Sequence, residues 1–154
     1  MIDPQTGALQ LRDGLIVDSN LSLRRFLRSS VGLGATVAYR SLEHSIFYVS
    51  EQDQHKRLLY ITLYFRCWKL EQLNISLSDL AVSKNSYDYD AEFQIHKAWL
   101  EASLGTALEG ENACRYAYFS GRWGSAEVAY DPRSDTTSIL IKYGKNLAQS
   151  RNSP

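Results

Sequence analysis

The stretch LLYITLYFRCWKLEQLNISL, residues 58–77, decides the fold of this chain. Its first part alternates, so that the apolar side chains from Leu59 to Phe65 recur at every second position and would share one face of a β-strand. The positions between them carry leucine, threonine and two tyrosines. Because both faces are apolar or aromatic, we expect a central strand that is covered on both sides.

A second strand is predicted after a turn at residues 66–69. The apolar side chains of residues 73–77 keep a period of two, whereas Leu70 is out of phase with them. One extra residue in a strand produces such a shift, so a β-bulge is expected near Glu71-Gln72. The two strands together predict a hairpin in the middle of a sheet.

Shorter elements precede this hairpin. Apolar side chains flank Arg12-Asp13-Gly14, and Asp-Gly between apolar runs is a strong signal for a tight hairpin turn. Residues 22–28 are predicted to form a short helix, because their apolar side chains fall at i, i+3 and i+4. Gly32-Leu33-Gly34 lacks the third glycine of a dinucleotide-binding motif and is predicted to be a loop, followed by strands at about 36–40 and 45–49.

The principal helix is predicted over residues 91–104. A polar segment of residues 78–90 leads into it, Asp88 or Asp90 can cap its start, and Gly105 can terminate it. Its buried face is expected to consist of Ala91, Ile95, Ala98, Trp99 and Ala102, broadened by Phe93, Leu100 and Leu104.

The remaining residues return to a β pattern after a connector at residues 106–114. Strands are predicted over about 115–119, 126–130 and 136–143, the last with Ile139, Ile141 and Tyr143 on its inner face.

The sequence therefore predicts an α+β fold. We expect an antiparallel sheet of about six to eight strands, with the main helix at about 91–104 packed on one face and a short N-terminal helix at about 22–28. Residues 1–143 are predicted to form a single domain and residues 144–154 a polar tail.

Composition narrows the functional classes. Seventeen lysines and arginines balance seventeen aspartates and glutamates, and this neutral sum argues against a nucleic-acid partner. The densest apolar run, residues 58–65, is far shorter than the roughly 18 residues of a membrane span, so no membrane partner is expected. The first residues lack the order of a signal peptide, and the two cysteines lie 47 positions apart, so we expect a reduced, cytoplasmic location.

No catalytic constellation is evident in the sequence. His44, His55 and His96 form no metal-ligand motif, and His96 is expected to be a hydrogen-bonded structural imidazole between core positions. Cys67 and Cys114 lie beside aromatic residues and are predicted to be buried structural thiols. We therefore predict no catalytic residues, no metal and no cofactor, and a protein that is not an enzyme.

A partner-binding patch is predicted in the acidic third of the chain. Residues 79–111 carry two lysines against seven aspartates and glutamates. Within them Tyr87-Asp88-Tyr89-Asp90 combines negative charge with a side chain that is favoured in protein interfaces. With Asp79 and Glu92 these are the candidate partner-binding residues. The alternative is a helix cap whose tyrosines fold onto the sheet.

Several motifs, taken in order, carry a resemblance to known proteins. They are Asp3-Pro4-x-Thr6-Gly7, Leu63-Tyr64-Phe65 with Leu70-Glu71-x-Leu73, Trp99-Leu100, Trp123-Gly124-Ser125, Tyr130-Asp131-Pro132-Arg133-Ser134 and Ser138-Ile139-x-Ile141-x-Tyr143. Their order resembles a family of small bacterial cytosolic proteins, some of which look like immunity proteins encoded beside secreted or contact-dependent toxins.

The resemblance implies an inhibitor that binds one cognate toxin domain, such as a nuclease, and blocks its active site. It implies no particular binding residue, because the binding surface varies within such families. The alternative function is a small-molecule-binding or enzymatic α+β domain with an aromatic cleft lined by Tyr64, Trp68 and Trp99. A homodimer joined through an open sheet edge is a third possibility, and the sequence leaves the oligomeric state open.

Overall fold

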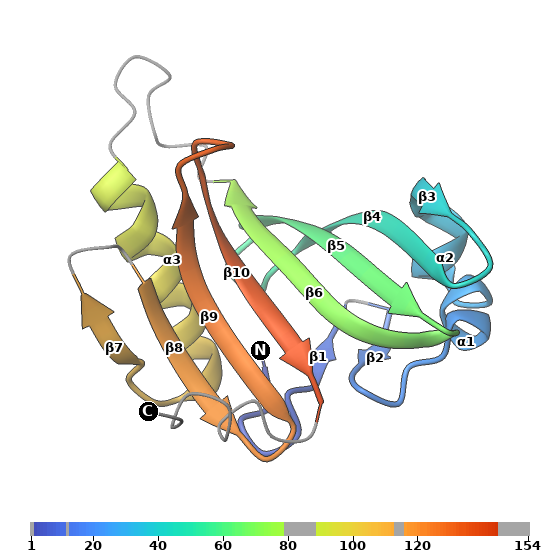
Figure 1. Cartoon of the computed structure of the whole chain (residues 1–154), viewed down its shortest axis with the longest axis horizontal. Coiled ribbons are helices and arrows are strands. Elements are labelled where there is room, and N and C mark those ends of the chain that lie inside the picture. Colours follow the sequence, from blue (N-terminus) through green and yellow to red (C-terminus); the bar gives the residue numbers. More distant parts are fainter. Residues whose placement is uncertain (1, 12, 79–88, 113–115, 145–154) are drawn as a thin grey trace, which may run out of the picture.

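The computed structural model has an α+β fold, as the sequence predicts (Figure 1). It describes the whole chain except residues 1, 12, 79–88, 113–115 and 145–154. In this part of the chain eight antiparallel strands form one large sheet, two short strands form a separate hairpin, and three helices pack beside them. No helix among the described residues is long and apolar enough to cross a membrane.

The described chain forms ten strands and three helices. The large sheet consists of β3 (Thr36–Arg40), β4 (His44–Gln52), β5 (Leu58–Arg66), β6 (Lys69–Ser78), β7 (Glu109–Asn112), β8 (Tyr116–Gly121), β9 (Gly124–Asp131) and β10 (Thr136–Tyr143). The other elements are β1 (Leu9–Gln10), β2 (Ile16–Val17), α1 (Leu23–Leu27), α2 (Ser30–Gly34) and α3 (Tyr89–Leu104).

The large sheet is made of two four-stranded meanders. Its strand order is β3-β4-β5-β6-β10-β9-β8-β7, so the last strand of each meander pairs with the last strand of the other. Ile75 of β6 lies opposite Ile139 of β10, and Leu73 lies opposite Ile141. A helical segment precedes each meander: α1 and α2 come before β3, and α3 comes before β7.

Only one face of this sheet is covered by the described elements. Figure 1 shows α3 and the β1–β2 hairpin behind the sheet, and α1 and α2 at its right-hand end. The odd-numbered residues of β5, from Leu59 to Phe65, point into the resulting core and are buried. On the opposite face Tyr60 remains 50% exposed. The prediction that β5 is covered on both sides is therefore wrong, because tyrosine and threonine hydroxyls let that face remain in contact with water.

The β5–β6 hairpin otherwise follows its prediction. Tyr64 pairs with Gln72 and Phe65 with Leu70, so Glu71 is the extra residue of the bulge. Cys67 and Trp68 form the turn, both with positive φ, at 45° and 71°. Cys67 is exposed there, which corrects the prediction that it is buried. Non-glycine residues rarely adopt this conformation, so the turn is strained.

An aromatic cluster fastens α1 to the sheet. The ring of Phe26 lies 5.1 Å from that of Phe47 and 5.4 Å from that of Phe65, and all three side chains are buried. Ser22 caps the helix by accepting a hydrogen bond from the backbone N–H of Arg25. Packing of this kind explains how a helix of only five residues is held in place.

The buried face of α3 is rotated relative to the prediction. The buried residues are Phe93, His96, Trp99, Leu100 and Leu104, whereas Ala98 and Ala102 are exposed. Two overlapping sets of positions have helical spacing, and the set with larger side chains packs against β9 and β10.

His96 belongs to this buried face as a structural imidazole, as predicted. It is 1% exposed, its Nε2 accepts a hydrogen bond from the Leu77 N–H at 3.1 Å, and its Nδ1 lies 2.9 Å from the Glu92 carbonyl oxygen. Burial lowers the pKa of His96, so the neutral ring is favoured.

Two elements were not predicted. Residues 30–34 form α2 instead of a loop, because the Ser29 hydroxyl accepts a hydrogen bond from Gly32 and caps the turn. A side chain at Gly32 would meet the Phe26 carbonyl oxygen, so only glycine fits there. The connector at residues 106–114 contains β7, whose polar sequence gives no β pattern and whose pairing with β8 supplies the strand.

Replacement of Trp99 should test the packing of α3. Trp99 is 8% exposed, so Trp99→Ala should lower the free energy of unfolding by about 3–5 kcal/mol, measured by urea denaturation. Trp68→Ala is the matched control: its side chain is 58% exposed, and a change of at most about 0.5 kcal/mol is expected. A loss below about 1 kcal/mol for Trp99→Ala would contradict this placement.

The strained turn makes a second prediction about stability. Trp68→Gly should raise the free energy of unfolding by about 0.5–1 kcal/mol, because glycine adopts positive φ without a steric penalty. The same urea titration checks the effect, with Trp68→Ala as the variant that keeps the strain. Equal stability of the two variants would show that the turn is relaxed.

Candidate functional site

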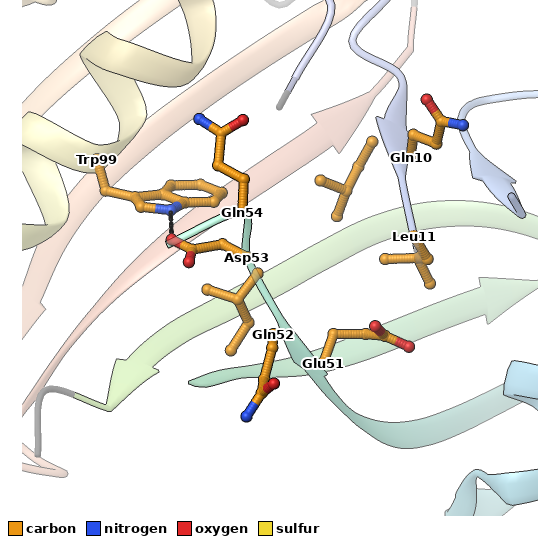
Figure 2. A pocket seen from close by; sticks show the side chains of 9 residues that line it. Gln10, Leu11, Glu51, Gln52, Asp53, Gln54 and Trp99 are labelled. Atoms are coloured by element: carbon orange, nitrogen blue, oxygen red, sulfur yellow. Dashed lines mark hydrogen bonds between the residues drawn. The ribbon is translucent and has the colours of Figure 1, made fainter. Parts of the chain in front are cut away.

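A cavity of about 470 Å³ lies where the end of β4 meets β1 and α3 (Figure 2). The N-terminal hairpin forms one wall, and the indole of Trp99 forms the opposite one. The cavity is lined by Leu9, Gln10, Leu11, Glu51, Gln52, Asp53, Gln54, Leu59 and Trp99.

Asp53 is one of two carboxylates in the lining of this cavity, the other being Glu51. Its Oδ1 accepts hydrogen bonds from the backbone N–H groups of His55 at 2.8 Å and Arg57 at 2.9 Å, and its Oδ2 accepts one from Trp99 Nε1 at 3.1 Å. Partial burial acts to raise the pKa of Asp53, but these hydrogen bonds outweigh it and the pKa is lowered. The carboxylate therefore stays ionised and fastens α3 to the β4–β5 turn.

The cavity is lined by carboxylate, amide, indole and aliphatic side chains. Figure 2 shows the amide of Gln54 beside the ring of Trp99, with Asp53 hydrogen-bonded to the indole. No cysteine, serine or histidine lines it. Within the described ranges, moreover, no three histidine, cysteine, aspartate or glutamate side chains group as a metal site would require. Amides around an indole suit a small polar ligand, and Asp53 already accepts three hydrogen bonds from the protein.

The structure does not bring together the aromatic residues of the predicted cleft. Trp68 lies in the β5–β6 turn, whereas Trp99 meets Asp53 beside the opposite end of β5. Tyr64 faces the uncovered side of the sheet. Trp99 alone lines the cavity, so an aromatic cleft of the predicted composition is not formed.

The structure describes only some residues of the predicted partner-binding patch. Asp79, Tyr87 and Asp88 lie outside the described residues. Asp90 is exposed in the first turn of α3, and Glu92 is half-buried.

Tyr89 folds onto the β9–β10 turn. Its hydroxyl donates to Asp135 Oδ2 at 2.6 Å, and the Tyr130 hydroxyl donates to Asp135 Oδ1 at 2.6 Å. The two rings are 5.2 Å apart. The hydrogen bonds from Tyr130 and Tyr89 lower the pKa of Asp135. At Tyr89 the arrangement is thus that of the alternative, a tyrosine folded onto the sheet.

Glu92 lies against β10 in an unfavourable setting for its charge. Burial raises its pKa, contact with Thr137 offsets part of this effect, and the charge of Asp135 adds to it. Glu92 Oε2 and Thr137 Oγ1 are buried and make no hydrogen bond of good geometry with the described residues. The ionised carboxylate is consequently less favourable in the folded protein than in the unfolded chain.

A larger surface with a distinct composition lies on the uncovered face of the sheet. Residues directly opposite each other in antiparallel strands point to the same side, so the strand register shows which residues share this face. Six tyrosines of the described chain lie on it: Tyr39, Tyr48, Tyr60, Tyr64, Tyr116 and Tyr118. We call this surface the tyrosine face.

The tyrosines form two groups separated by small polar residues. On β3–β5, Tyr39, Tyr48 and Tyr60 are each at least half exposed. On β8 the rings of Tyr116 and Tyr118 lie 5.9 Å apart. The strands between, β6, β10 and β9, carry on this side the uncharged polar residues Gln72, Asn74, Ser76, Ser138 and Ser125, together with the apolar Leu140 and Ala129.

The middle of the tyrosine face is nearly neutral. Its charged residues in β9 and β10, Glu127 and Lys142, form an ion pair at 2.9 Å, and Glu127 also accepts a hydrogen bond from Tyr116. The sequence signal for this surface was present in the alternate tyrosines of β5. It was interpreted as a covered face, because periodicity shows which side chains share a face but not what lies against it.

The raised pKa of Glu92 leads to a prediction about how the effect of Glu92→Gln on stability depends on pH. Glu92→Gln should raise the free energy of unfolding at pH 7 by an amount below about 1 kcal/mol, because the penalty for burying the charge is removed. The gain should shrink to zero as the pH falls below the ordinary glutamate pKa of about 4.3, where the carboxyl is protonated in both states. Urea titrations from pH 3.5 to 8 measure it, with Glu43→Gln in the exposed β3–β4 turn as the control. A gain that persists at the lowest pH would contradict the assignment.

Comparisons with known proteins found no relative of this chain. No family model matches the sequence, and neither a curated protein nor a solved structure shows a significant match to it. The function therefore has to be inferred from the residues and surfaces of the molecule itself.

Proposed function

We propose that the chain is an immunity-type inhibitor, which binds a cognate bacterial toxin domain through the tyrosine face and blocks its active site. The observation that carries the proposal is the composition of that face. Large, stiff, half-polar rings are mixed there with small hydroxyl and amide side chains. Tyrosine with serine and asparagine is the composition of antibody paratopes, in which tyrosine supplies a large contact area at a low cost in conformational entropy and the small polar side chains supply adaptable hydrogen bonds.

The size of the face is sufficient for a stable protein complex. Eight strands spaced about 4.8 Å apart span about 34 Å; β4, β5, β6, β9 and β10, with eight to ten residues, extend about 26–33 Å, and β3, β7 and β8, with four to six residues, extend about 13–20 Å. A standard interface buries about 800 Å² on each partner, which is less than this area. One partner domain can therefore cover the face without any rearrangement of the sheet.

The chemistry of the face also fits binding better than catalysis. Burial, together with nearby Tyr48, raises the pKa of Tyr64, so its hydroxyl stays protonated at neutral pH and can both donate and accept hydrogen bonds. With Glu127 and Lys142 paired, the middle of the face presents little net charge. The complementary toxin surface is accordingly expected to be polar and aromatic, not strongly basic.

The proposed binding surface is not the partner-binding patch that the sequence analysis predicted in the acidic third of the chain. Asp90 and Glu92 belong to α3, which packs on the covered side of the sheet, whereas the tyrosines lie on the other side. Variants on the two sides of the sheet can therefore tell the two surfaces apart.

A double substitution on the tyrosine face tests the function. The chain and its Tyr48→Ser/Tyr60→Ser variant serve as parallel baits, and a captured toxin domain is then produced separately for calorimetry and for an assay of its own activity. The unsubstituted chain should bind and inhibit the toxin domain. The double variant should bind at least 100-fold more weakly, because two half-exposed interface rings are lost.

The matched control is Asp90→Asn/Glu92→Gln, which changes the opposite side of the sheet and should leave the affinity unchanged. Full affinity of the tyrosine variant together with a loss in the control would move the interface to the acidic patch. A captured domain whose activity is not inhibited would contradict the immunity function itself.

A further inference from the structure

Basic side chains of two distant segments meet at one end of the molecule. Arg24, Arg25 and Arg28 come from α1 and its C-terminal cap, and Lys69 follows the β5–β6 turn. The backbone joins the two segments: the Leu23 N–H donates to the Trp68 carbonyl oxygen at 2.8 Å, and Ser22 forms a β-bridge with Lys69. In Figure 1 this is the right-hand end, where α1 lies beside the tip of the β5–β6 hairpin. A chain of zero net charge thus has a locally basic surface.

The arginines surround a hollow of about 650 Å³. Its lining consists of Leu15, Ser22, Arg24, Arg25, Arg28 and Ser29, and we call it the arginine hollow. All three arginines are exposed, and none of them makes an ion pair with a described residue. In contrast, Arg66 in the same region pairs with Glu71 at 3.6 Å.

The arrangement of the three arginines is unfavourable without an anion. Arg24 and Arg28 are four positions apart and Arg25 and Arg28 three apart, so like charges face each other along one side of a helical turn. α1 has no acidic residue in its first turn that could offset them. A bound anion would remove this repulsion.

The two hydroxyl groups of the hollow differ in their hydrogen bonds, since Ser29 both donates and accepts whereas Ser22 only accepts. Ser22 Oγ accepts from the Arg25 N–H, and Ser29 Oγ donates to the Phe26 carbonyl oxygen while accepting from the Gly32 N–H. The donors left for a ligand are the guanidinium groups and the Ser22 O–H, with Leu15 as an apolar wall. Planar guanidinium forks bind phosphate oxygens in pairs, and a phosphate offers more oxygens to three such forks than a single carboxylate does.

We propose that the arginine hollow binds a phosphate-bearing small molecule of nucleotide size. Its volume lies within the range of about 300–1,000 Å³ typical of small-molecule sites. The site is independent of the toxin-binding function, because α1 packs on the covered side of the sheet through Phe26, away from the tyrosine face.

Titration with ATP, pyrophosphate and inorganic phosphate tests the site, using calorimetry on the full chain. ATP should bind, and Arg24→Gln/Arg28→Gln should weaken its binding at least tenfold and flatten the dependence of affinity on salt. Arg122→Gln/Arg133→Gln is the control with the same change of charge, at exposed arginines of other turns, and should bind ATP as the unsubstituted chain does. Unfolding in urea should show that the Arg24/Arg28 variant is at least as stable as the unsubstituted chain, since a repulsion is removed.

Three results would overturn the proposal. The first is equal ATP affinity for the Arg24/Arg28 variant and the unsubstituted chain. The second is a glutamate-rich peptide that binds the hollow as tightly as ATP, which would show that the site recognises negative charge and not phosphate. The third is a single-stranded oligonucleotide that displaces ATP at much lower concentration, which would make nucleic acid the ligand. ATP binding should be unchanged in Tyr48→Ser/Tyr60→Ser, so failure of one proposal is distinguishable from failure of the other.

Discussion

The pairing of β6 with β10 is the interaction on which the rest of the structure depends. It joins two meanders that are distant in sequence, and its central pairs, Ile75 with Ile139 and Leu73 with Ile141, are fully buried. α3 is the next element in the chain after β6 and packs against β9 and β10, so the surface that it covers is tied to the first meander only when this pairing is formed. Closing the long loop between the two strands costs chain entropy, which burial of the combined inner face offsets.

The N-terminal segment completes the cover of that inner face. The Tyr143 hydroxyl at the end of β10 donates to the carbonyl oxygens of Gly7 at 3.0 Å and Val17 at 3.2 Å, and Trp123 Nε1 donates to that of Pro4 at 3.0 Å. These bonds join the first residues of the domain to its last strands. Burial raises the pKa of Tyr143, so its hydroxyl remains a donor at any physiological pH. Among the described elements all cover lies on this side, and the tyrosine face on the other side of the sheet is the surface that we propose for a partner.

The described part of the molecule has two surfaces with different chemistry. The tyrosine face is broad and nearly neutral in its middle, and it suits a protein partner that is recognised by shape and hydrogen bonds. The arginine hollow is small and cationic, and it suits a compact anion. The net charge of the chain could not reveal these two surfaces. Acidic residues in and near α3 cancel the arginines in the sum, although the acidic residues and the arginines lie in different parts of the molecule.

Local sequence determined the elements whose signals are complete within a few residues. The alternation of β5 and β10, the bulge at Glu71 and the stop at Gly105 all follow from side-chain period and backbone preference. Tertiary structure decided which face of α3 is buried, whether β5 is covered on one side or two, and that the turn after β5 meets α1. Of the candidate patch, Tyr89 is oriented by Asp135, a residue 46 positions away, which no local pattern can reveal. Period and propensity describe a segment by itself, whereas these outcomes depend on the free energy of contacts between distant segments.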